Sequence, residues 1–205
     1  MNPTPAEMWE SRYSAEHCVY GTSPNDFMVD LIADAPPGRA LCLADGEGRN
    51  GVYLASLGHT VTSVDLTAAG LSKAARLATK KGVDLTTVVA DLAEYDLGSG
   101  QWDLIVSIFA HTPPAIRARV HNSTATALAD GGLFVLEAYT PDQIGTGTGG
   151  PPTPELTMSL DEVQRELTGM EIVSGLETVR PVIEGPGHTG DGAVVQVVAK
   201  KRNGL

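Results

Sequence analysis

The stretch that decides the fold runs from Ala40 to Asp65 and reads ALCLADGEGRNGVYLASLGHTVTSVD. Its apolar runs Ala40–Ala44 and Val61–Val64 predict two buried strands, and the apolar spacing of Asn50–Leu57 predicts a helix between them. A strand, a glycine-containing turn, a helix and a second strand that ends in an acidic residue are typical of a nucleotide-binding α/β unit.

The turn after the first predicted strand, Asp45-Gly46-Glu47-Gly48-Arg49-Asn50, is expected to hold a ligand. Glycines let the backbone pass close to a ligand because they lack a Cβ. Asp65 follows Gly46 by about 20 residues, the distance at which an acidic side chain accepts hydrogen bonds from ribose hydroxyls. We therefore predict a nucleoside-cofactor site with contacts from Asp45, Gly46, Glu47, Gly48, Asn50, Asp65 and Leu66.

The charge of this turn indicates which cofactor it binds. A carboxylate at Glu47 would repel the pyrophosphate that dinucleotide sites seat on the helix N-terminus, although Gly51 fills the third glycine position. The same carboxylate would not repel the sulfonium and ammonium groups of S-adenosylmethionine. The sequence thus favours S-adenosylmethionine, and no metal is predicted because no cluster of His, Cys and carboxylates has ligand spacing.

The remainder of the chain continues the alternation of strands and helices. Helices are expected at about Pro5–Ala15 and Asn25–Ala33, before the breaker Pro36-Pro37-Gly38. Later strands and helices alternate, which predicts a parallel sheet covered on both faces. The predicted strands are Leu85–Val89, Leu104–Ile108 and Leu133–Leu136, and the predicted helices are Ala68–Lys80 and Ala115–Ala129.

The last third of the chain has a different pattern. A capping box at Ser159-Leu160-Asp161-Glu162 opens a short helix that runs to about Leu167. The runs Glu171–Ile183 and Ala193–Ala199 then predict an antiparallel hairpin. The predicted fold class is therefore α/β, a Rossmann-like doubly wound sheet, mostly parallel and ending in an antiparallel hairpin, in a single domain over residues 1–205.

Further site residues are expected where the third and fourth predicted strands end. Asp91 is placed to receive the adenine amine, and Leu92 to contact the adenine ring. Ser107 and Phe109 lie at the carboxyl end of the fourth strand, beside the switch point where ligands bind in open α/β sheets, and His111 follows them. We predict that Ser107 and Phe109 contact S-adenosylmethionine, the methyl donor, and that His111 is a catalytic residue.

Composition excludes several classes of partner. The formal net charge of −11 disfavours nucleic acid and anionic membrane surfaces. Cys42 lies in an apolar strand and only Cys18 accompanies it, so we expect a reducing, cytoplasmic location. No signal peptide and no membrane-spanning run is visible. The expected partner is a small-molecule methyl acceptor, and the expected assembly is a monomer or a homodimer.

The chain resembles class I methyltransferases of the tellurite-resistance and thiopurine-methyltransferase-like branch. The resemblance runs over the whole chain and rests on four stretches: Trp9-Glu10-Ser11-Arg12-Tyr13, Tyr20-Gly21-Thr22-Ser23-Pro24-Asn25-Asp26-Phe27, Gly46-Glu47-Gly48-Arg49-Asn50 and Thr148-Gly149-Gly150-Pro151. It implies that residues 1–35 form a lid over the cofactor, with Trp9, Tyr13 and Tyr20 as lid residues. Two departures are Ala44, where the family has a glycine, and Cys42, where an acid is common, so that Asp45 or Glu47 would have to neutralise the amino group of the donor.

The nature of the acceptor is the least constrained expectation. Methyl transfer from a sulfonium is an in-line displacement that needs no general base when the nucleophile is already anionic, and the histidines are scattered along the sequence. This pattern favours a thiol or another chalcogen nucleophile. The alternatives are an O- or N-methyltransferase that uses His111 or His188 as a base, and a non-catalytic S-adenosylmethionine-binding protein.

The acceptor pocket is expected to form from two segments rich in glycine. One is the loop after the fifth strand, residues 141–157, and the other is the turn around His188. Long irregular loops in compact domains are more often functional than idle. We predict that Tyr139, Thr148–Pro151 and His188 shape the pocket for the acceptor.

Overall fold

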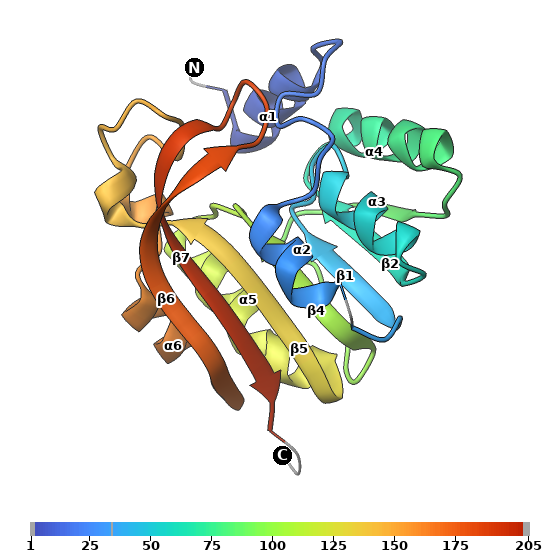
Figure 1. The fold of residues 1–205 in the computed structure, drawn as a ribbon, viewed down its shortest axis with the longest axis vertical. Helices are drawn as coiled ribbons and strands as arrows, with labels where there is room; N and C mark the ends of the chain where they lie inside the picture. The colour runs from blue at the N-terminus through green and yellow to red at the C-terminus, as the bar shows by residue number, and fades with distance from the viewer. Residues whose placement is uncertain (1–2, 34, 203–205) are drawn as a thin grey trace.

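The computed structural model describes residues 3–33 and 35–202. The parts of the predicted domain and of the predicted lid that fall at residues 1–2, 34 and 203–205 lie outside the described residues. The elements are α1 (Pro5–Tyr13), α2 (Asp26–Ile32), β1 (Arg39–Leu43), α3 (Arg49–Ser56), β2 (Thr60–Asp65), α4 (Ala68–Lys81), β3 (Thr86–Val89), β4 (Trp102–Ile108), α5 (Pro114–Ala127), β5 (Leu128–Tyr139), the 3-10 turns η1 (Pro141–Gln143) and η2 (Pro154–Leu156), α6 (Leu160–Glu166), β6 (Met170–Ile183) and β7 (Thr189–Lys201) (Figure 1).

The strands form a seven-stranded sheet in the order β3-β2-β1-β4-β5-β7-β6. Strands β1 to β5 pair in parallel, and β7 is antiparallel to both β5 and β6. The predicted fold class is therefore confirmed, including the antiparallel hairpin at the end of the chain. None of the helices in the described ranges is long and apolar enough to cross a membrane.

Side chains of β1 alternate between two hydrophobic cores. Leu41 and Leu43 pack in one core, together with residues of α5 and α6, whereas Ala40 and Cys42 pack in the other, together with residues of α2 and α3. Alternation of this kind is required because successive side chains of a strand point to opposite faces. The sheet is covered on both faces, as the sequence predicts (Figure 1).

Most predicted boundaries differ from the observed ones by one or two residues, but β5 and β7 are longer than predicted. Strand β5 begins at Leu128 instead of Leu133, and β7 begins at Thr189 instead of Ala193. Both extensions are rich in polar residues and glycine, a composition typical of a turn, but their backbones pair: Leu128 with Trp102 and Thr189 with Ile183. Pairing across the sheet outweighs local propensity there.

The carboxyl ends of the parallel strands meet at one edge of the sheet, and α1 and the β6–β7 turn lie over that edge (Figure 1). The first residues after β1 and β4 have left-handed backbones, with φ of 48° at Ala44 and 52° at Phe109. Such a conformation costs on the order of 1–3 kcal/mol for a residue with a side chain and clusters at functional sites. Position 44, where the resembled family has a glycine, thus requires a left-handed backbone conformation.

Candidate active site

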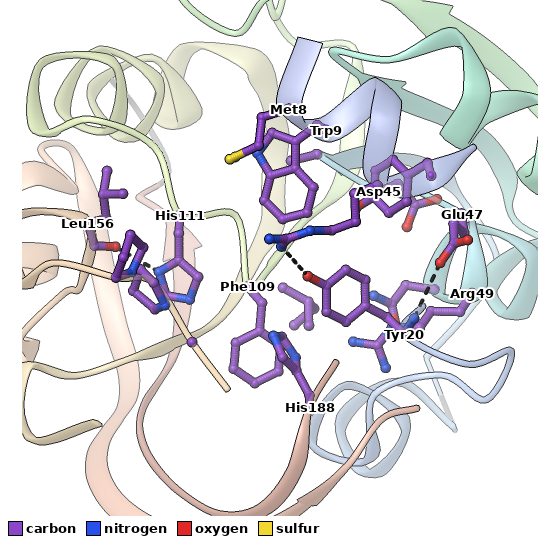
Figure 2. Close-up of a pocket in the computed structure, with 18 residues that line it drawn as sticks. Met8, Trp9, Tyr20, Asp45, Glu47, Arg49, Phe109, His111, Leu156 and His188 are labelled. Atoms are coloured by element: carbon purple, nitrogen blue, oxygen red, sulfur yellow. Dashed lines mark hydrogen bonds between the residues drawn. The ribbon is translucent and has the colours of Figure 1, made fainter. Parts of the chain in front are cut away.

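A cavity of about 560 Å³ opens at this edge of the sheet, a volume within the range of small-molecule sites (Figure 2). Its wall combines residues from α1, the segment before α2, the β1–α3 turn, the end of β4, the 141–157 loop and the β6–β7 turn. The lining residues are Met8, Trp9, Arg12, Tyr13, Tyr20, Ala44, Asp45, Glu47, Arg49, Asn50, Ile108, Phe109, His111, Gly150, Pro151, Pro152, Leu156 and His188. Segments far apart in the sequence therefore build one cavity.

Asp45 brings a carboxylate to the cavity wall. Its Oδ2 accepts a hydrogen bond of 2.5 Å from the Ser63 hydroxyl, and its Oδ1 accepts one of 3.4 Å from the Gly51 N–H. Desolvation in the cavity raises the pKa of Asp45 to about 7. A positively charged ligand group would stabilise the ionised carboxylate.

Glu47 also lines the cavity, but its carboxylate binds groups of the protein. Oε1 accepts a 2.7 Å hydrogen bond from Lys73 Nζ in a buried ion pair, and Oε2 accepts hydrogen bonds from the backbone N–H groups of Val19 and Tyr20 at 2.7 and 3.3 Å. Glu47 therefore ties the N-terminal segment to the turn after β1. Of the two carboxylates predicted to face the donor's amino group, Asp45 is the better placed.

Asp65 lies at the end of β2, as expected, beneath helix α1. Its carboxylate accepts hydrogen bonds from the Gly46 N–H at 2.9 Å and from Thr67, through N–H and Oγ1, at 2.9 and 2.7 Å. Tyr13 packs on Gly46 so closely that a Cβ at that position would lie 2.5 Å from the Tyr13 hydroxyl. Tyr13 thus stands between the cavity and the region around Asp65.

Helix α1 is fastened at a second point as well. The Glu10 carboxylate accepts hydrogen bonds of 3.2 Å from the Ala69 N–H, in the first turn of α4, whose N-cap residue makes no side-chain cap of its own. A carboxylate at a helix N-terminus is favourable because it satisfies free N–H groups and complements the helix dipole. Leu66 lies on the far side of this contact, in a shallow surface groove with Glu10.

Several predicted cofactor contacts do not reach the cavity wall. Asp91 is exposed and accepts a 2.8 Å hydrogen bond from the Ala93 N–H, as a turn residue would. Leu92 and Ser107 are buried beside a separate small hollow that also includes Arg117. Gly46, Gly48, Asp65, Leu66, Asp91, Leu92 and Ser107 are the predicted contacts that do not line the main cavity.

Aromatic rings surround the middle of the cavity. Trp9 and Tyr13 stack with centroids 5.5 Å apart, and the His188 ring lies 4.5 Å from Tyr20, 4.9 Å from Phe109 and 5.2 Å from Tyr139. Figure 2 shows Phe109 and His188 side by side, with the Tyr20 ring facing them. The predicted lid residues and the predicted acceptor residues therefore share one site.

His111 is held by the protein at both ring nitrogens. Nδ1 lies 2.8 Å from the Leu156 carbonyl oxygen, and Nε2 accepts a 3.4 Å hydrogen bond from the Tyr139 N–H. This arrangement assigns the neutral tautomer with its proton on Nδ1, and desolvation lowers the pKa of His111 to about 4. His111 is accordingly a poor general base, and its contacts connect η2 with the ends of β4 and β5.

His188 has a different environment. It is only 8% exposed, and among the described residues its buried Nδ1 has no hydrogen-bond partner and lies 3.7 Å from Glu184 Oε2. Burial lowers the pKa of His188, although Glu184 acts in the opposite direction. The ring is therefore neutral at pH 7 and able to accept a proton. His111 and His188, which are far apart in the sequence, both line this cavity.

The 141–157 loop is ordered by one buried side chain, Gln143. Its Nε2 donates hydrogen bonds to Thr146, Thr148 and the Gly149 carbonyl, and its Oε1 accepts one from the Ala193 N–H at 2.9 Å. The Thr148 hydroxyl donates to the Asp191 carbonyl oxygen at 2.8 Å. This loop is thereby fixed to β7, with Gly150, Pro151 and Pro152 on the cavity wall.

A buried network of charged residues adjoins the cavity through Arg49, and it was not predicted from the sequence. Glu137 is fully buried and receives two hydrogen bonds from Arg180, while Glu184 forms a 2.5 Å ion pair with Arg49. Asn25 donates hydrogen bonds to both carboxylates, at 2.5 and 2.7 Å. One signal was present, since Glu137 interrupts an apolar strand, where a charged residue needs a buried partner.

Comparisons with known proteins agree with this geometry. A family model described as a methyltransferase domain matches residues 40–132. No curated protein matches the chain. Many solved structures share the fold, and among them is one described as "Conversion of a Disulfide Bond into a Thioacetal Group during Echinomycin Biosynthesis", with a TM-score of 0.79, 19% identity and coverage of 98% of this chain and 93% of that chain.

Two further similar structures are methyltransferase-fold proteins from named bacteria. TehB from Haemophilus influenzae is similar with a TM-score of 0.69 at 20% identity, covering 95% of this chain and 66% of that chain. Magnesium protoporphyrin IX methyltransferase from Synechocystis PCC 6803, solved with bound S-adenosylhomocysteine, is similar with a TM-score of 0.64 at 15% identity, covering 96% and 83%. The fold is therefore that of the Rossmann-like methyltransferases.

The matched domain and the fold define the class of protein. Over residues 40–132 the chain matches a methyltransferase domain, and its fold is the one that S-adenosylmethionine-dependent methyltransferases share. The molecule that accepts the methyl group has to be inferred from the residues that line the cavity.

Proposed function

We propose that the chain methylates a small molecule at a chalcogen atom, either the sulfur of a thiol or another chalcogen nucleophile. The observation that carries this proposal is the apolar and aromatic part of the cavity wall, which Met8, Trp9, Phe109 and Leu156 line. A polarisable thiolate is hydrated less strongly than an alkoxide, so it loses less on entering such a wall. A thiol also ionises near neutral pH, with a pKa of about 8.5.

The similar structure from echinomycin biosynthesis supports sulfur chemistry, because its description names the conversion of a disulfide bond. A second candidate is O- or N-methylation of a small metabolite. His188 favours this candidate, since its ring is neutral and lies near the Glu184 carboxylate, the usual arrangement for a base that deprotonates a harder nucleophile. The open cavity disfavours the third alternative, a binding protein without catalysis.

Titration of the purified protein with S-adenosylhomocysteine, followed by a methyl-acceptor screen, tests the proposal. The screen should contain small thiols, selenite, small amines and small alcohols. Turnover with thiols or selenite above that with amines and alcohols is the expected result. Turnover restricted to amines or alcohols would establish the second candidate instead.

The residues present fit S-adenosylmethionine, which supplies an electrophilic methyl group on a sulfonium. We infer that the Asp45 carboxylate pairs with its ammonium group and that Asp65, at the end of β2, receives the ribose hydroxyls. The raised pKa of Asp45 supports the first assignment. Burial destabilises the ionised carboxylate, and an ammonium group beside it would stabilise that form. Asn50, whose Oδ1 accepts the Asn25 N–H at 2.9 Å, lines the same wall and connects it to the N-cap of α2.

Asp45 should make donor binding depend on pH. An ammonium group pairs only with the ionised carboxylate, so the affinity for S-adenosylhomocysteine is expected to fall as pH drops below about 7, by up to tenfold per unit. It should fall again at strongly alkaline pH, where the ligand's own amino group loses its proton. In Asp45→Asn the acidic limb should vanish and the affinity at pH 7.5 should be lower. Calorimetric titration between pH 5.5 and 9 measures both, and an unchanged acidic limb in the variant would contradict the assignment.

We also infer that residues 1–35 act as a lid over the donor, with the 141–157 loop on the acceptor side. Because Tyr13 packs on Gly46 and Glu10 caps α4, helix α1 must open before a ribose can reach Asp65. Trp9, Tyr13 and Tyr20 would then close over the donor and exclude water. Amide hydrogen exchange over residues 6–27 is expected to slow when S-adenosylhomocysteine is added. Identical exchange with and without the ligand would make this segment an ordinary scaffold.

A further inference from the structure

Arg12 contributes to the cavity a positive charge that no carboxylate of the described residues pairs with. Its guanidinium lies 4.5 Å from the centre of the Trp9 ring, and its Nη1 donates a 3.0 Å hydrogen bond to the Tyr20 hydroxyl, marked by a dashed line in Figure 2. Across residues 3–33 and 35–202 no ion pair joins Arg12 to a carboxylate, whereas the other arginine of the wall, Arg49, is paired with Glu184.

The acids of the wall do not compensate this charge. Glu47 is paired with Lys73, and within the described residues the Asp45 carboxylate accepts its hydrogen bonds from Ser63 and Gly51. The chain has 25 acidic residues against 14 basic ones, so potential partners for an arginine are plentiful. An arginine that stays unpaired on a cavity wall in such a chain has the properties of an anion-binding group.

The contacts of Arg12 also set its orientation. Stacking on Trp9 restricts the plane of the guanidinium, and the Tyr20 hydroxyl occupies one of its N–H groups. A guanidinium has five N–H donors in a rigid fork that matches a carboxylate, so donors remain for a ligand. Arg12 is thus a preorganised fork at the wall of the cavity.

We propose that Arg12 binds an anionic group of the methyl acceptor, so that the acceptor is a small thiol that carries a carboxylate. The inference rests on the proposed function, since it specifies the acceptor of that same site. Met8, Trp9 and Leu156 supply apolar contacts for the body of such a molecule. The Tyr20 ring, which holds Arg12 through its hydroxyl, packs 4.5 Å from His188, so an acceptor anchored at Arg12 lies next to the base.

The donor contains a carboxylate too, and the two sources must be separated by experiment. The probes are two thioethers that represent methylated products: methylthiopropionate, which is anionic, and methylthioethanol, which is neutral. Each is titrated by calorimetry into protein saturated with S-adenosylhomocysteine, for the wild type, Arg12→Gln and Arg12→Lys. The dissociation constant of S-adenosylhomocysteine itself is measured for the same three proteins.

We expect the wild type to bind the anionic thioether about tenfold or more tightly than the neutral one. Arg12→Gln should remove this preference, and Arg12→Lys should retain part of it, because lysine keeps the charge but loses the fork. Any loss of affinity for S-adenosylhomocysteine in Arg12→Gln should be smaller than the loss for the anionic thioether, because Arg12 is expected to reach the donor only through the lid residues Trp9 and Tyr20. Thermal melting of the variants confirms that they fold.

The inference would be overturned if the wild type showed no preference for the anionic thioether, or if Arg12→Gln kept that preference unchanged. It would also be overturned if Arg12→Gln lost mainly its affinity for S-adenosylhomocysteine, because Arg12 would then bind the carboxylate of the donor. The readout is binding and needs no turnover. Failure of the proposed function can therefore be distinguished. If the Arg12-dependent preference is observed but no thiol is methylated, the anion site at Arg12 stands and the proposed thiol acceptor is wrong.

Discussion

Replacing His188 with phenylalanine is expected to lower kcat/KM for a thiol acceptor at pH 7 by about 30-fold, because without a base only the roughly 3% of a thiol of pKa about 8.5 that is already ionised at this pH reacts. His188 is neutral because burial lowers its pKa, and Glu184 lies 3.7 Å from Nδ1, where it can stabilise the ring after protonation. Phenylalanine preserves the packing against Tyr20, Phe109 and Tyr139 but accepts no proton.

The pH profile separates a base from a packing residue. In the wild type the rate should decline only as pH falls through the lowered pKa of His188, below its ordinary value of about 6.5. In His188→Phe the rate should instead rise with pH up to the pKa of the thiol, about 8.5, because only pre-formed thiolate reacts. The difference between the two proteins should therefore shrink at high pH.

Two controls accompany this measurement. The affinity for S-adenosylhomocysteine should stay within about twofold, because His188 is expected to contact the acceptor and not the donor. His188→Ala removes the packing as well as the base, so comparison with His188→Phe isolates the chemistry. Wild-type turnover in both variants would exclude His188 from the reaction.

The parts of the site that lie within one stretch of chain could be predicted from the sequence. The turn from Asp45 to Asn50 and the position of Asp65 follow from a local strand–turn–helix–strand pattern, in which each residue's place depends on its near neighbours. The mostly parallel sheet that ends in an antiparallel hairpin also follows from the alternation of strands and helices. Ala44 illustrates the limit, since its left-handed backbone becomes visible only in the structure.

Partners that are distant in sequence could not be predicted. Glu47 reads as a free charge in the turn, but Lys73 reaches it from α4 and neutralises it. His111 and His188 are equivalent candidates by sequence, and they are distinguished only by the hydrogen bonds that Leu156 and Tyr139 make to His111. Arg12 belongs to one of the stretches that resemble class I methyltransferases, yet the absence of an ion pair to it among the described residues is a property of the folded cavity.

Replacing Asp65 with alanine is expected to weaken binding of S-adenosylhomocysteine at least tenfold. A hydrogen bond to a charged acceptor contributes about 1.5–3 kcal/mol, which corresponds to roughly 10- to 150-fold in affinity. Asp65 already accepts hydrogen bonds from Gly46 and Thr67, so the variant also loses contacts within the turn. Thr67→Ala is the matched control, because it removes one of these contacts and leaves the carboxylate in place.

A donor analogue that lacks one ribose hydroxyl completes the test as a double-mutant cycle. The wild type should bind the deoxy analogue more weakly than S-adenosylhomocysteine, whereas Asp65→Ala should bind the two ligands equally, because the hydroxyl then has no carboxylate to donate to. Thr67→Ala should discriminate as the wild type does. If Asp65→Ala still discriminates between the ligands, or if its melting temperature falls in step with its affinity, Asp65 serves the turn beneath Tyr13 and does not bind the ribose.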